Sequence, residues 1–229
     1  MNRTDREPSI SRVPVHAYII TAVIAYFFGS IPTGFLVARA KGVDIRQAGS
    51  GNIGATNAFR VLGRGWGIAV LLLDFAKGLG ACLLVPLIVR ACLNLTVESE
   101  GTITLALVAA VCAVVGHNFT VWLRFKGGKG IATTAGALSA LVPWALLIGF
   151  GVWFVLLALT RYVSLGSIAA AVAIPVSTWF ITNGDPALSG LTAVLGIMAI
   201  LKHRSNIKRL LAGTESRIAL GSQPKGKHS

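Results

Sequence analysis

The sequence has 229 residues, of which 54% are hydrophobic and only 13% are charged, and its mean hydropathy is +0.73. Soluble domains carry about 25% charged residues, so this composition excludes an ordinary soluble domain and predicts transmembrane helices. The net charge is +13, and the basic residues lie in short gaps between apolar runs. That pattern favours lipid headgroups and small anions as partners, and argues against nucleic acid.

The cysteines and histidines do not form a metal-binding or disulfide pattern. The three cysteines lie in or beside apolar runs without a Cys-x-x-Cys motif, and the four histidines are far apart in the sequence. We therefore expect the cysteines to be small buried hydrophobic residues and expect no metal site.

Apolar runs in chain order predict the helices. Runs that could cross a bilayer lie at residues 16–38, 66–90, 103–123, 163–182 and, slightly short, 187–201. The first run is longer than a signal-peptide core, and Arg39 is a poor neighbour for a cleavage site, so we expect an uncleaved helix. The stretch 130–160 is too long for one untilted helix, and Pro143 near its middle either kinks one helix or separates two short ones.

Loop charge decides the topology. Basic residues mark cytoplasmic loops, and they fill the gaps after the first, third and last runs. Acidic residues mark the gaps near 91–102 and 183–186. Alternation then makes 130–160 a hairpin of two short helices. The predicted fold is an all-α integral membrane protein of about seven transmembrane helices, with the N-terminus outside and the C-terminus cytoplasmic. The predicted divisions are a disordered polar tail (1–15), a single polytopic membrane domain (16–217) and a disordered basic tail (218–229).

The first polar segment, residues 48–60, contains Gly-x-Gly-x-x-Gly. A dinucleotide site would need a strand before this motif and an α/β unit around it, whereas the surroundings here are predicted transmembrane helices. Closely spaced glycines can still form an anion-binding nest. Ser50, Asn52, Thr56 and Asn57 add neutral donors, and Arg60 adds a fork for two phosphate oxygens. The alternative is a flexible loop between helices.

The second polar segment comprises residues 116–119 and 125–133. It is not a Walker A loop, because Gly130 follows Lys129 where that motif has Ser or Thr. Lys126 and Lys129 flank two glycines, Gly127 and Gly128, just before a predicted helix start, which is a strong anion-binding arrangement. The alternative is ordinary positive-inside flanking, which needs lysines but not glycines. His117 alone is more often a structural histidine.

The third polar segment comprises residues 203–210 and 213–215. His203 and Asn206 are three positions apart and would share a helical face. The alternative is a basic juxtamembrane tail that binds lipid headgroups.

Two ionisable residues interrupt an apolar run. Asp74 and Lys77 are one helical turn apart, and each costs about 2.5–3.5 kcal/mol on membrane-insertion scales. We expect them to pair with each other, or Lys77 to pair with another acid. A structural pair is favoured over a catalytic acid.

The three segments together resemble the bacterial acyl-phosphate:glycerol-3-phosphate acyltransferases, the PlsY family. The resemblance runs from about residue 18 to residue 217. The matching letters are Gly49–Asn57 with Arg60, Gly116-His117, Phe125–Gly130 with Ala132-Thr133, and His203 with Asn206-Ile207 and Arg209-Leu210.

This resemblance implies a multi-pass enzyme of the bacterial inner membrane with its active site facing the cytoplasm. It implies acyl transfer from acyl phosphate to position 1 of glycerol 3-phosphate, giving lysophosphatidic acid and phosphate, the first acylation of phospholipid biosynthesis. The implied partners are these two substrates, membrane lipid and, functionally, the enzyme that makes acyl phosphate. An acyl phosphate is already an activated anhydride, so no cofactor and no covalent enzyme intermediate are expected.

The resemblance also implies residue roles. Arg60, Lys126, His203 and Asn206 would hold glycerol 3-phosphate. Ser50, Asn52 and the loop Lys126-Gly127-Gly128-Lys129-Gly130 would hold the acyl phosphate. His117 and His203 are candidate catalytic residues because they titrate in the right range, although the leaving phosphate could accept the proton instead.

Two further considerations bear on mechanism and function. The His-x-x-x-x-Asp pair of other glycerol-phosphate acyltransferases is absent, because Trp122 stands five residues after His117 and Lys208 stands five after His203. The rival function is a phosphate or organic-anion transporter, since broken helices and cationic loops also occur in transporters. Against that rival, the polar groups cluster on one predicted face and no internal repeat is evident.

Overall fold

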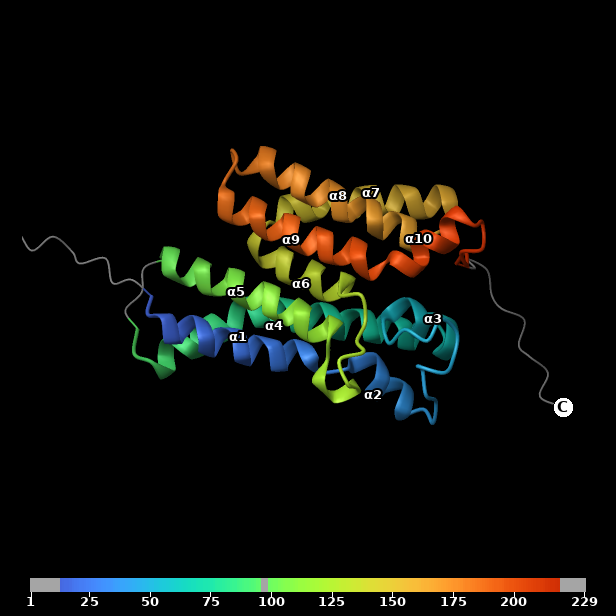
Figure 1. The fold of residues 1–229 in the computed structure, drawn as a ribbon, viewed down its shortest axis with the longest axis horizontal. Coiled ribbons are helices and arrows are strands. Elements are labelled where there is room, and N and C mark those ends of the chain that lie inside the picture. The colour runs from blue at the N-terminus through green and yellow to red at the C-terminus, as the bar shows by residue number, and fades with distance from the viewer. Residues whose placement is uncertain (1–12, 96–98, 219–229) are drawn as a thin grey trace, which may run out of the picture. The chain divides into compact units, whose positions relative to one another are not determined.

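The computed structural model describes residues 13–95 and 99–218, and the described residues form helices and connecting loops (Figure 1). They divide into two compact units, the first ending at Leu141 and the second beginning at Val142. Most of the two tails that the sequence predicts to be disordered lies outside the described residues. The helices of the first unit are α1 (Val15–Ser30), α2 (Thr33–Arg39), α3 (Ala55–Leu62), α4 (Arg64–Cys92), α5 (Ser99–Asn118), the 3-10 helix η1 (Val121–Leu123) and α6 (Ile131–Leu141).

The second unit contains α7 (Pro143–Thr160), α8 (Val163–Ile181), α9 (Pro186–Lys202) and α10 (Arg204–Leu211). Proline sets several of the helix boundaries. Pro143 and Pro186 occupy the first positions of α7 and α9, where a missing N–H costs nothing. The Asp185 side chain caps α9 by accepting a hydrogen bond from Leu188 N at 2.8 Å. In the first unit, Pro32 lies in the break between α1 and α2.

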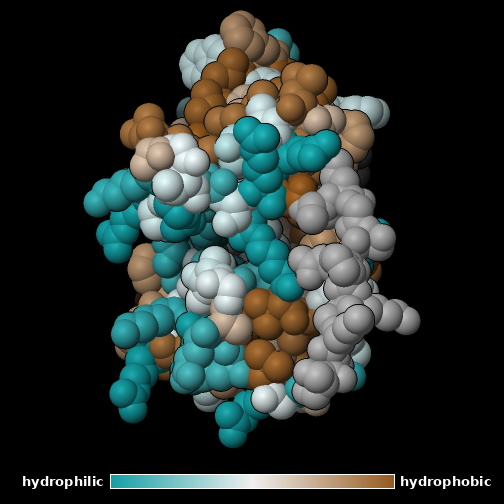
Figure 2. Space-filling view, turned by 90° about the vertical axis from the view of Figure 1, so that its right-hand side faces the viewer, coloured by the Kyte–Doolittle hydropathy of each residue, from teal (hydrophilic) through white to brown (hydrophobic). Residues whose placement is uncertain are grey.

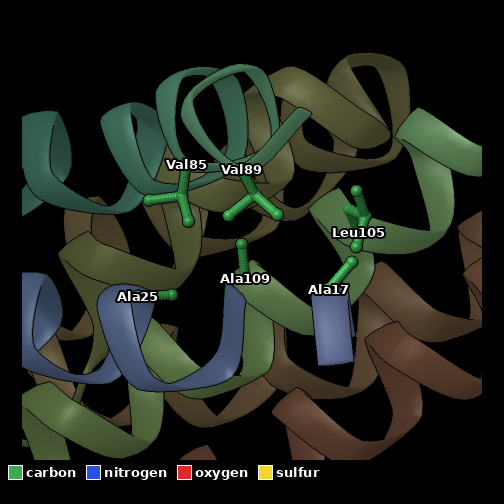
Figure 3. Packing of buried hydrophobic residues seen from close by; sticks show 6 residues of the cluster. All are labelled: Ala17, Ala25, Val85, Val89, Leu105 and Ala109. Carbon is green, nitrogen blue, oxygen red and sulfur yellow. The ribbon is translucent and has the colours of Figure 1, made fainter. Parts of the chain in front are cut away.

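Small residues let the helices of the first unit approach closely. Ala17, Ala25, Val85, Val89, Leu105 and Ala109 of α1, α4 and α5 form one buried cluster (Figure 3). Glycines make the tightest crossing: a Cβ on Gly78 of α4 would lie 1.9 Å from the Thr133 carbonyl oxygen of α6, and one on Gly136 of α6 would lie 1.9 Å from the Phe75 carbonyl oxygen of α4. Small residues allow such approaches in membrane helices, and here they fix the start of α6, and the loop before it, against α4.

The outer faces of the helices are apolar. Large hydrophobic side chains are exposed on α1, α4, α7 and α8, including Leu72 at 60%, Phe150 at 57% and Phe180 at 74%. Patches of this kind are a liability in water and are typical of surfaces that contact lipid. Within the described residues, five helical segments are long and apolar enough to cross a membrane, and a sixth is added if α9 and α10, bent by 57°, count as one. The chain is therefore a multi-pass membrane protein.

The expected apolar segments are all helical, with differences in detail. The first run breaks into α1 and α2, and the third leaves the α-helix at Asn118 before η1. The stretch 130–160 splits into two helices next to Pro143, as expected. α6 has 11 residues and is about 16 Å long, shorter than the hydrocarbon core of about 30 Å. The number of full crossings and the orientation of the termini stay predictions.

Candidate functional site

The first glycine-rich loop, residues 40–54, is organised by one buried side chain. Asn57, at the start of α3, accepts a hydrogen bond from Ser50 N at 2.8 Å. Its Nδ2 atom donates to the carbonyl oxygens of Ile45, Ala48 and Asn52 at 3.2, 3.0 and 2.8 Å. The Asn57 side chain is therefore used inside the loop, and the sequence-based expectation that it donates to a phosphate gives way to a shaping role.

The expected binding residues of this loop lie around that framework. Ser50 is exposed. Asn52 is partly buried, and its Oδ1 atom accepts from Gly54 N at 2.8 Å, which leaves the amide Nδ2 of Asn52 as the donor end of the side chain. Arg60 lies on α3, two residues before the helix ends at Leu62, and is partly exposed.

The second glycine-rich loop, residues 125–130, docks on the end of α5 through its main chain. Gly127 N donates to the Asn118 carbonyl oxygen at 3.3 Å and Gly128 N to the His117 carbonyl oxygen at 3.1 Å. The docking requires glycine, because a Cβ on Gly127 would lie 2.0 Å from the His117 carbonyl oxygen and one on Gly128 would lie 2.2 Å from His117 Nε2. Gly130 has φ +78°, a left-handed conformation that glycine adopts without cost.

These contacts revise the reason for the glycines in the second loop. Two of the amides that the sequence offered to an anion are committed to main-chain carbonyls, so close packing against His117 and Asn118 accounts for Gly127 and Gly128. The groups of this segment that could bind an anion are then the side chains and the first turn of α6. Lys126 is exposed, Lys129 is partly exposed, and both precede that turn, where N–H groups point toward the loop.

The Asp74–Lys77 pair exists and belongs to a larger cluster. Lys77 Nζ lies 2.8 Å from Asp74 Oδ1 and donates to the Ile31 carbonyl oxygen at 2.9 Å. The Thr33 hydroxyl also donates to Asp74 Oδ1, and His117 Nδ1 lies 3.5 Å from the same oxygen. Asp74, Lys77 and His117 are 2%, 5% and 5% exposed. The expectation that Asp74 and Lys77 pair is confirmed, and His117 is buried beside them.

The two loops lie at the same end of the first unit. Leu123, just before the second loop, is buried in one cluster with Ile45, Ile53 and Ala58 from the first loop and α3. The α1 and α5 helices end together there, because Tyr26 OH donates to the Phe119 carbonyl oxygen at 2.9 Å and Ser30 Oγ donates to the Gly116 carbonyl oxygen at 3.3 Å.

This end of the first unit is strongly basic. Figure 2 views the side at which α2 and α3 lie in Figure 1, and hydrophilic side chains gather on it. The exposed cations of the segments at this end are Arg39, Lys41, Arg46, Arg64, Arg124 and Lys126. Asp44 is paired with Arg46 at 2.7 Å, and hydrogen bonds from the Arg46 side chain lower the pKa of Asp44 to about 2. The remaining charge at this end is cationic and suits phosphate ligands.

The third segment, in the second unit, is held by a buried carboxylate. His203 lies at the bend between α9 and α10, and its Nδ1 atom is 2.7 Å from the Ala199 carbonyl oxygen. Asn206 Nδ2 donates to Glu215 Oε1 at 2.6 Å, Ser164 Oγ donates to the same oxygen at 2.7 Å, and Arg209 Nε donates to Glu215 Oε2 at 2.7 Å. Burial opposes the ionisation of Glu215, but these hydrogen bonds outweigh it and hold the pKa of Glu215 below its ordinary value.

The predicted site residues thus fall into two sets. Ser50, Asn52, Arg60, His117 and the Lys126–Gly130 loop belong to the first unit, and His203 and Asn206 belong to the second. Sequence reasoning missed the shaping roles of Asn57 and Glu215. Both residues belong to the sequence motifs, and the sequence alone does not distinguish a polar side chain that faces a ligand from one that hydrogen-bonds its own loop.

These features define a class: a polytopic α-helical membrane protein with basic, glycine-rich loops. The chain matches the family model described as glycerol-3-phosphate acyltransferase over residues 19–213. It is 46% identical over 199 residues to the glycerol-3-phosphate acyltransferase of Geobacter sulfurreducens, covering 87% of this chain and 96% of the relative. It is 44% identical over 200 residues to the glycerol-3-phosphate acyltransferase of Thermosynechococcus vestitus, and this match covers 87% of this chain and 94% of the relative.

Solved structures agree with this result. The fold is similar to the crystal structure of PlsY (YgiH), an integral membrane glycerol 3-phosphate acyltransferase, in its glycerol 3-phosphate form, with a TM-score of 0.76 and 36% identity over 89% of this chain and 96% of that one. The lysophosphatidic acid form of the same protein gives a TM-score of 0.74. The chain belongs to the glycerol-3-phosphate acyltransferase family and is an integral membrane enzyme of that kind.

Proposed function

We propose that the chain transfers an acyl group from an acyl phosphate to position 1 of glycerol 3-phosphate, and that the products are lysophosphatidic acid and inorganic phosphate. This would be the first acylation of phospholipid biosynthesis. The observation that carries the proposal is the docked Lys126–Gly130 loop at the basic end of the first unit, in a member of the acyltransferase family. An acyl phosphate carries its phosphate on the reacting carbonyl, so a phosphate loop serves both recognition and leaving-group stabilisation.

The reaction needs few groups from the protein. The position-1 hydroxyl oxygen of glycerol 3-phosphate attacks the acyl carbonyl carbon and forms an ester bond. The bond between that carbon and the phosphate oxygen breaks, and its electron pair leaves with the phosphate. The hydroxyl proton goes to a phosphate oxygen or to a histidine. Lys126 and Lys129 would stabilise the charge that develops on the leaving phosphate.

Residue roles follow the family likeness and fit the local geometry. Arg60 and Lys126, with His203 and Asn206, would bind glycerol 3-phosphate. Ser50, Asn52 and residues 126–130 would bind the acyl phosphate. Because Asn206 donates to Glu215, its amide orientation is defined, and its oxygen is the accepting end of the side chain.

His203 suits an orienting role. Its Nδ1 atom lies 2.7 Å from a carbonyl oxygen, which only accepts, so Nδ1 carries the proton and Nε2 of the neutral ring is an acceptor. An acceptor at Nε2 would align a substrate hydroxyl for attack. Proton transfer to the leaving phosphate then completes the reaction without an enzyme base.

We place the enzyme in the bacterial inner membrane, with its substrate loops on the cytoplasmic side and a functional link to the enzyme that makes acyl phosphate. The basis is the loop charge, because basic gaps face the cytoplasm. A tag inserted at Asp185 should be accessible from outside intact cells, and a tag at Ser229 should be accessible only after permeabilisation. The opposite accessibility would place the loops on the wrong side of the membrane.

The activity test uses purified protein in lipid nanodiscs with glycerol 3-phosphate and one of two donors, acyl phosphate or acyl-coenzyme A. We expect lysophosphatidic acid and one phosphate per turnover from acyl phosphate, and no product from the thioester. Product from the thioester alone would overturn the donor assignment. Uptake of glycerol 3-phosphate into sealed vesicles without acyl transfer would favour a transporter.

A further inference from the structure

Asp74 is a buried carboxylate for which the proposed reaction has no direct use. It lies in α4 and is 2% exposed. One oxygen, Oδ1, is the contact point for the Thr33 hydroxyl, the Lys77 ammonium at 2.8 Å and His117 Nδ1 at 3.5 Å. Three different segments, the start of α2, the middle of α4 and the end of α5, therefore meet at one oxygen atom.

His117 connects this oxygen to the second glycine-rich loop. Its ring has Nδ1 on the Asp74 side, while a Cβ on Gly128 would lie 2.2 Å from Nε2 on the other side. Its main-chain oxygen accepts from Gly128 N at 3.1 Å. The imidazole thus stands between the carboxylate and the loop, and a shift of the ring displaces the loop that packs on it.

Lys77 connects the same oxygen to the break between α1 and α2. Its Nζ atom bonds both Asp74 Oδ1 and the Ile31 carbonyl oxygen, which precedes Pro32. A pair kept for stability alone is a weak explanation for this cluster, because replacing a buried ion pair with apolar residues is often neutral or stabilising. The contacts to His117 and Thr33 offer a different reason for the carboxylate.

We propose that Asp74 is a positioning residue that sets the Lys126–Gly130 loop through His117. A carboxylate beside Nδ1 favours the ring tautomer with the proton on Nδ1 and fixes the ring plane, as carboxylates do for histidines in other sites. Gly128 then packs against a ring of defined orientation, and the two lysines of the loop are held at a defined place. The inference rests on the proposed function for its kinetic consequence, but its structural consequence does not depend on that function.

The first test separates positioning from charge neutralisation. Asp74→Asn alone leaves the Lys77 ammonium buried without its counter-charge, so the informative variant is Asp74→Asn with Lys77→Met, which removes both charges. We expect this double variant to insert and to unfold near the wild-type temperature. Its KM for acyl phosphate should rise about 10–100-fold, by analogy with the loss seen when the partner that orients a metal-binding histidine is removed, with kcat lowered less than about threefold. Asp185→Asn, an acid-to-amide change that keeps a helix cap, is the matched control and should leave KM unchanged.

The second test asks whether the effect passes through His117. In a His117→Gln background the double substitution should add less than about twofold, because residues that act in series are not additive. Wild-type kinetics in the charge-balanced double variant would make Asp74 merely the counter-ion of Lys77. Multiplicative losses with His117→Gln would mean that Asp74 acts by another route.

The third test does not depend on catalysis. Amide hydrogen exchange of a peptide that covers residues 126–130 reports whether Gly127 N and Gly128 N keep their hydrogen bonds. We expect faster exchange in the double variant. Thr33→Val removes one hydrogen bond to Asp74 Oδ1 and should give a smaller increase in exchange. This variant replaces the double variant if the double variant does not insert. Faster exchange in a protein that makes no lysophosphatidic acid would sustain the positioning role and refute the proposed function. Unchanged exchange in both variants would overturn the positioning role, whatever the activity.

Discussion

The two glycine-rich loops of the first unit are held in opposite ways. The first is held by a side chain: the amide of Asn57 accepts from Ser50 N and donates to three carbonyl oxygens of the loop. The second is held by main-chain bonds from Gly127 and Gly128 to the end of α5, with His117 packed against Gly128. A loop of the first kind fails when its central side chain changes, and a loop of the second kind fails when a glycine gains a side chain.

The largest effect should come from Asn57→Asp. The carboxylate can still accept from Ser50 N, but it faces the carbonyl oxygens of Ile45, Ala48 and Asn52 without a hydrogen to donate. A buried charge without compensation costs about 3–5 kcal/mol. We therefore expect activity to fall by roughly 10³-fold, since each 1.4 kcal/mol is about tenfold. Thermal unfolding in detergent measures the loss of stability, and the acyl-transfer assay measures the loss of activity.

The matched control for that substitution is Asn183→Asp. This residue is exposed and has φ +51°, a conformation that Asp tolerates nearly as well as Asn. Its stability and activity should stay within about twofold of wild type, as for most surface changes. Equal tolerance of Asp at positions 57 and 183 would show that the first loop does not depend on the Asn57 amide.

The next largest effect should come from Gly128→Ala, which tests the main-chain loop. The new Cβ would lie 2.2 Å from His117 Nε2, so either the ring leaves its place beside Asp74 or the loop lifts from α5. Misplacement by about 1 Å can cost about 10²-fold in rate, and we expect a loss of that size in kcat/KM. Gly65→Ala is the control, because a Cβ there meets no atom within 4 Å. Comparable losses at both positions would refute the packing explanation.

Hydropathy and loop charge were enough to predict the helices and the break next to Pro143, but not the other helix boundaries. The seven apolar segments are helical because their composition leaves no other way to satisfy the main chain in lipid. The sequence did not reveal α3, because this helix follows a glycine-rich stretch directly and has polar residues in its first turn. It also did not reveal the end of α5 at Asn118, because hydrophobic residues continue through Leu123.

For the site, the sequence located the segments but not the direction of their side chains. Asn57 and Ser50 are both polar residues of one motif, yet one is 2% exposed and the other lies at the surface. That difference arises from tertiary packing around Ile45 and Ala58, which no periodicity encodes. The pairing of Asp74 with Lys77 was predictable because one-turn spacing on a helix brings two charges together, whereas the approach of His117 depends on how α5 packs on α4.

A smaller effect is expected from removing the lysines of the second loop. Lys126→Ala and Lys129→Ala each remove one cation from the proposed phosphate site, and a hydrogen bond to a charged group contributes about 1.5–3 kcal/mol. We expect kcat/KM to fall about 10–100-fold in each variant. Because the main chain holds this loop, amide exchange at Gly127 and Gly128 should be unchanged in Lys126→Ala. Lys41→Ala, which removes an exposed cation lying 4.2 Å from the Trp66 ring centroid, is the control. An equal loss at Lys41 would mean that only overall charge matters.

The smallest effect should come from His203→Gln in the second unit. Like the first loop, this region is held by side chains, since Glu215 fixes Asn206 and Arg209, but His203 itself bonds a main-chain oxygen. Glutamine keeps a donor and an acceptor near that place and cannot act as a base near neutral pH.

An orienting His203 therefore predicts a KM for glycerol 3-phosphate raised about tenfold, which corresponds to one hydrogen bond of about 1.4 kcal/mol, with kcat lowered less than about threefold. A catalytic base predicts the reverse, a kcat lowered about 10²–10⁴-fold at nearly constant KM. The exposed His16 at the start of α1 supplies the control, His16→Gln, which should change neither constant. We expect the KM effect because a mixed anhydride is a strong electrophile and its leaving phosphate brings its own proton-accepting oxygens. A collapse of kcat in His203→Gln, with membrane insertion and thermal unfolding as in wild type, would make His203 the proton acceptor and rule out proton transfer to the phosphate as the main route.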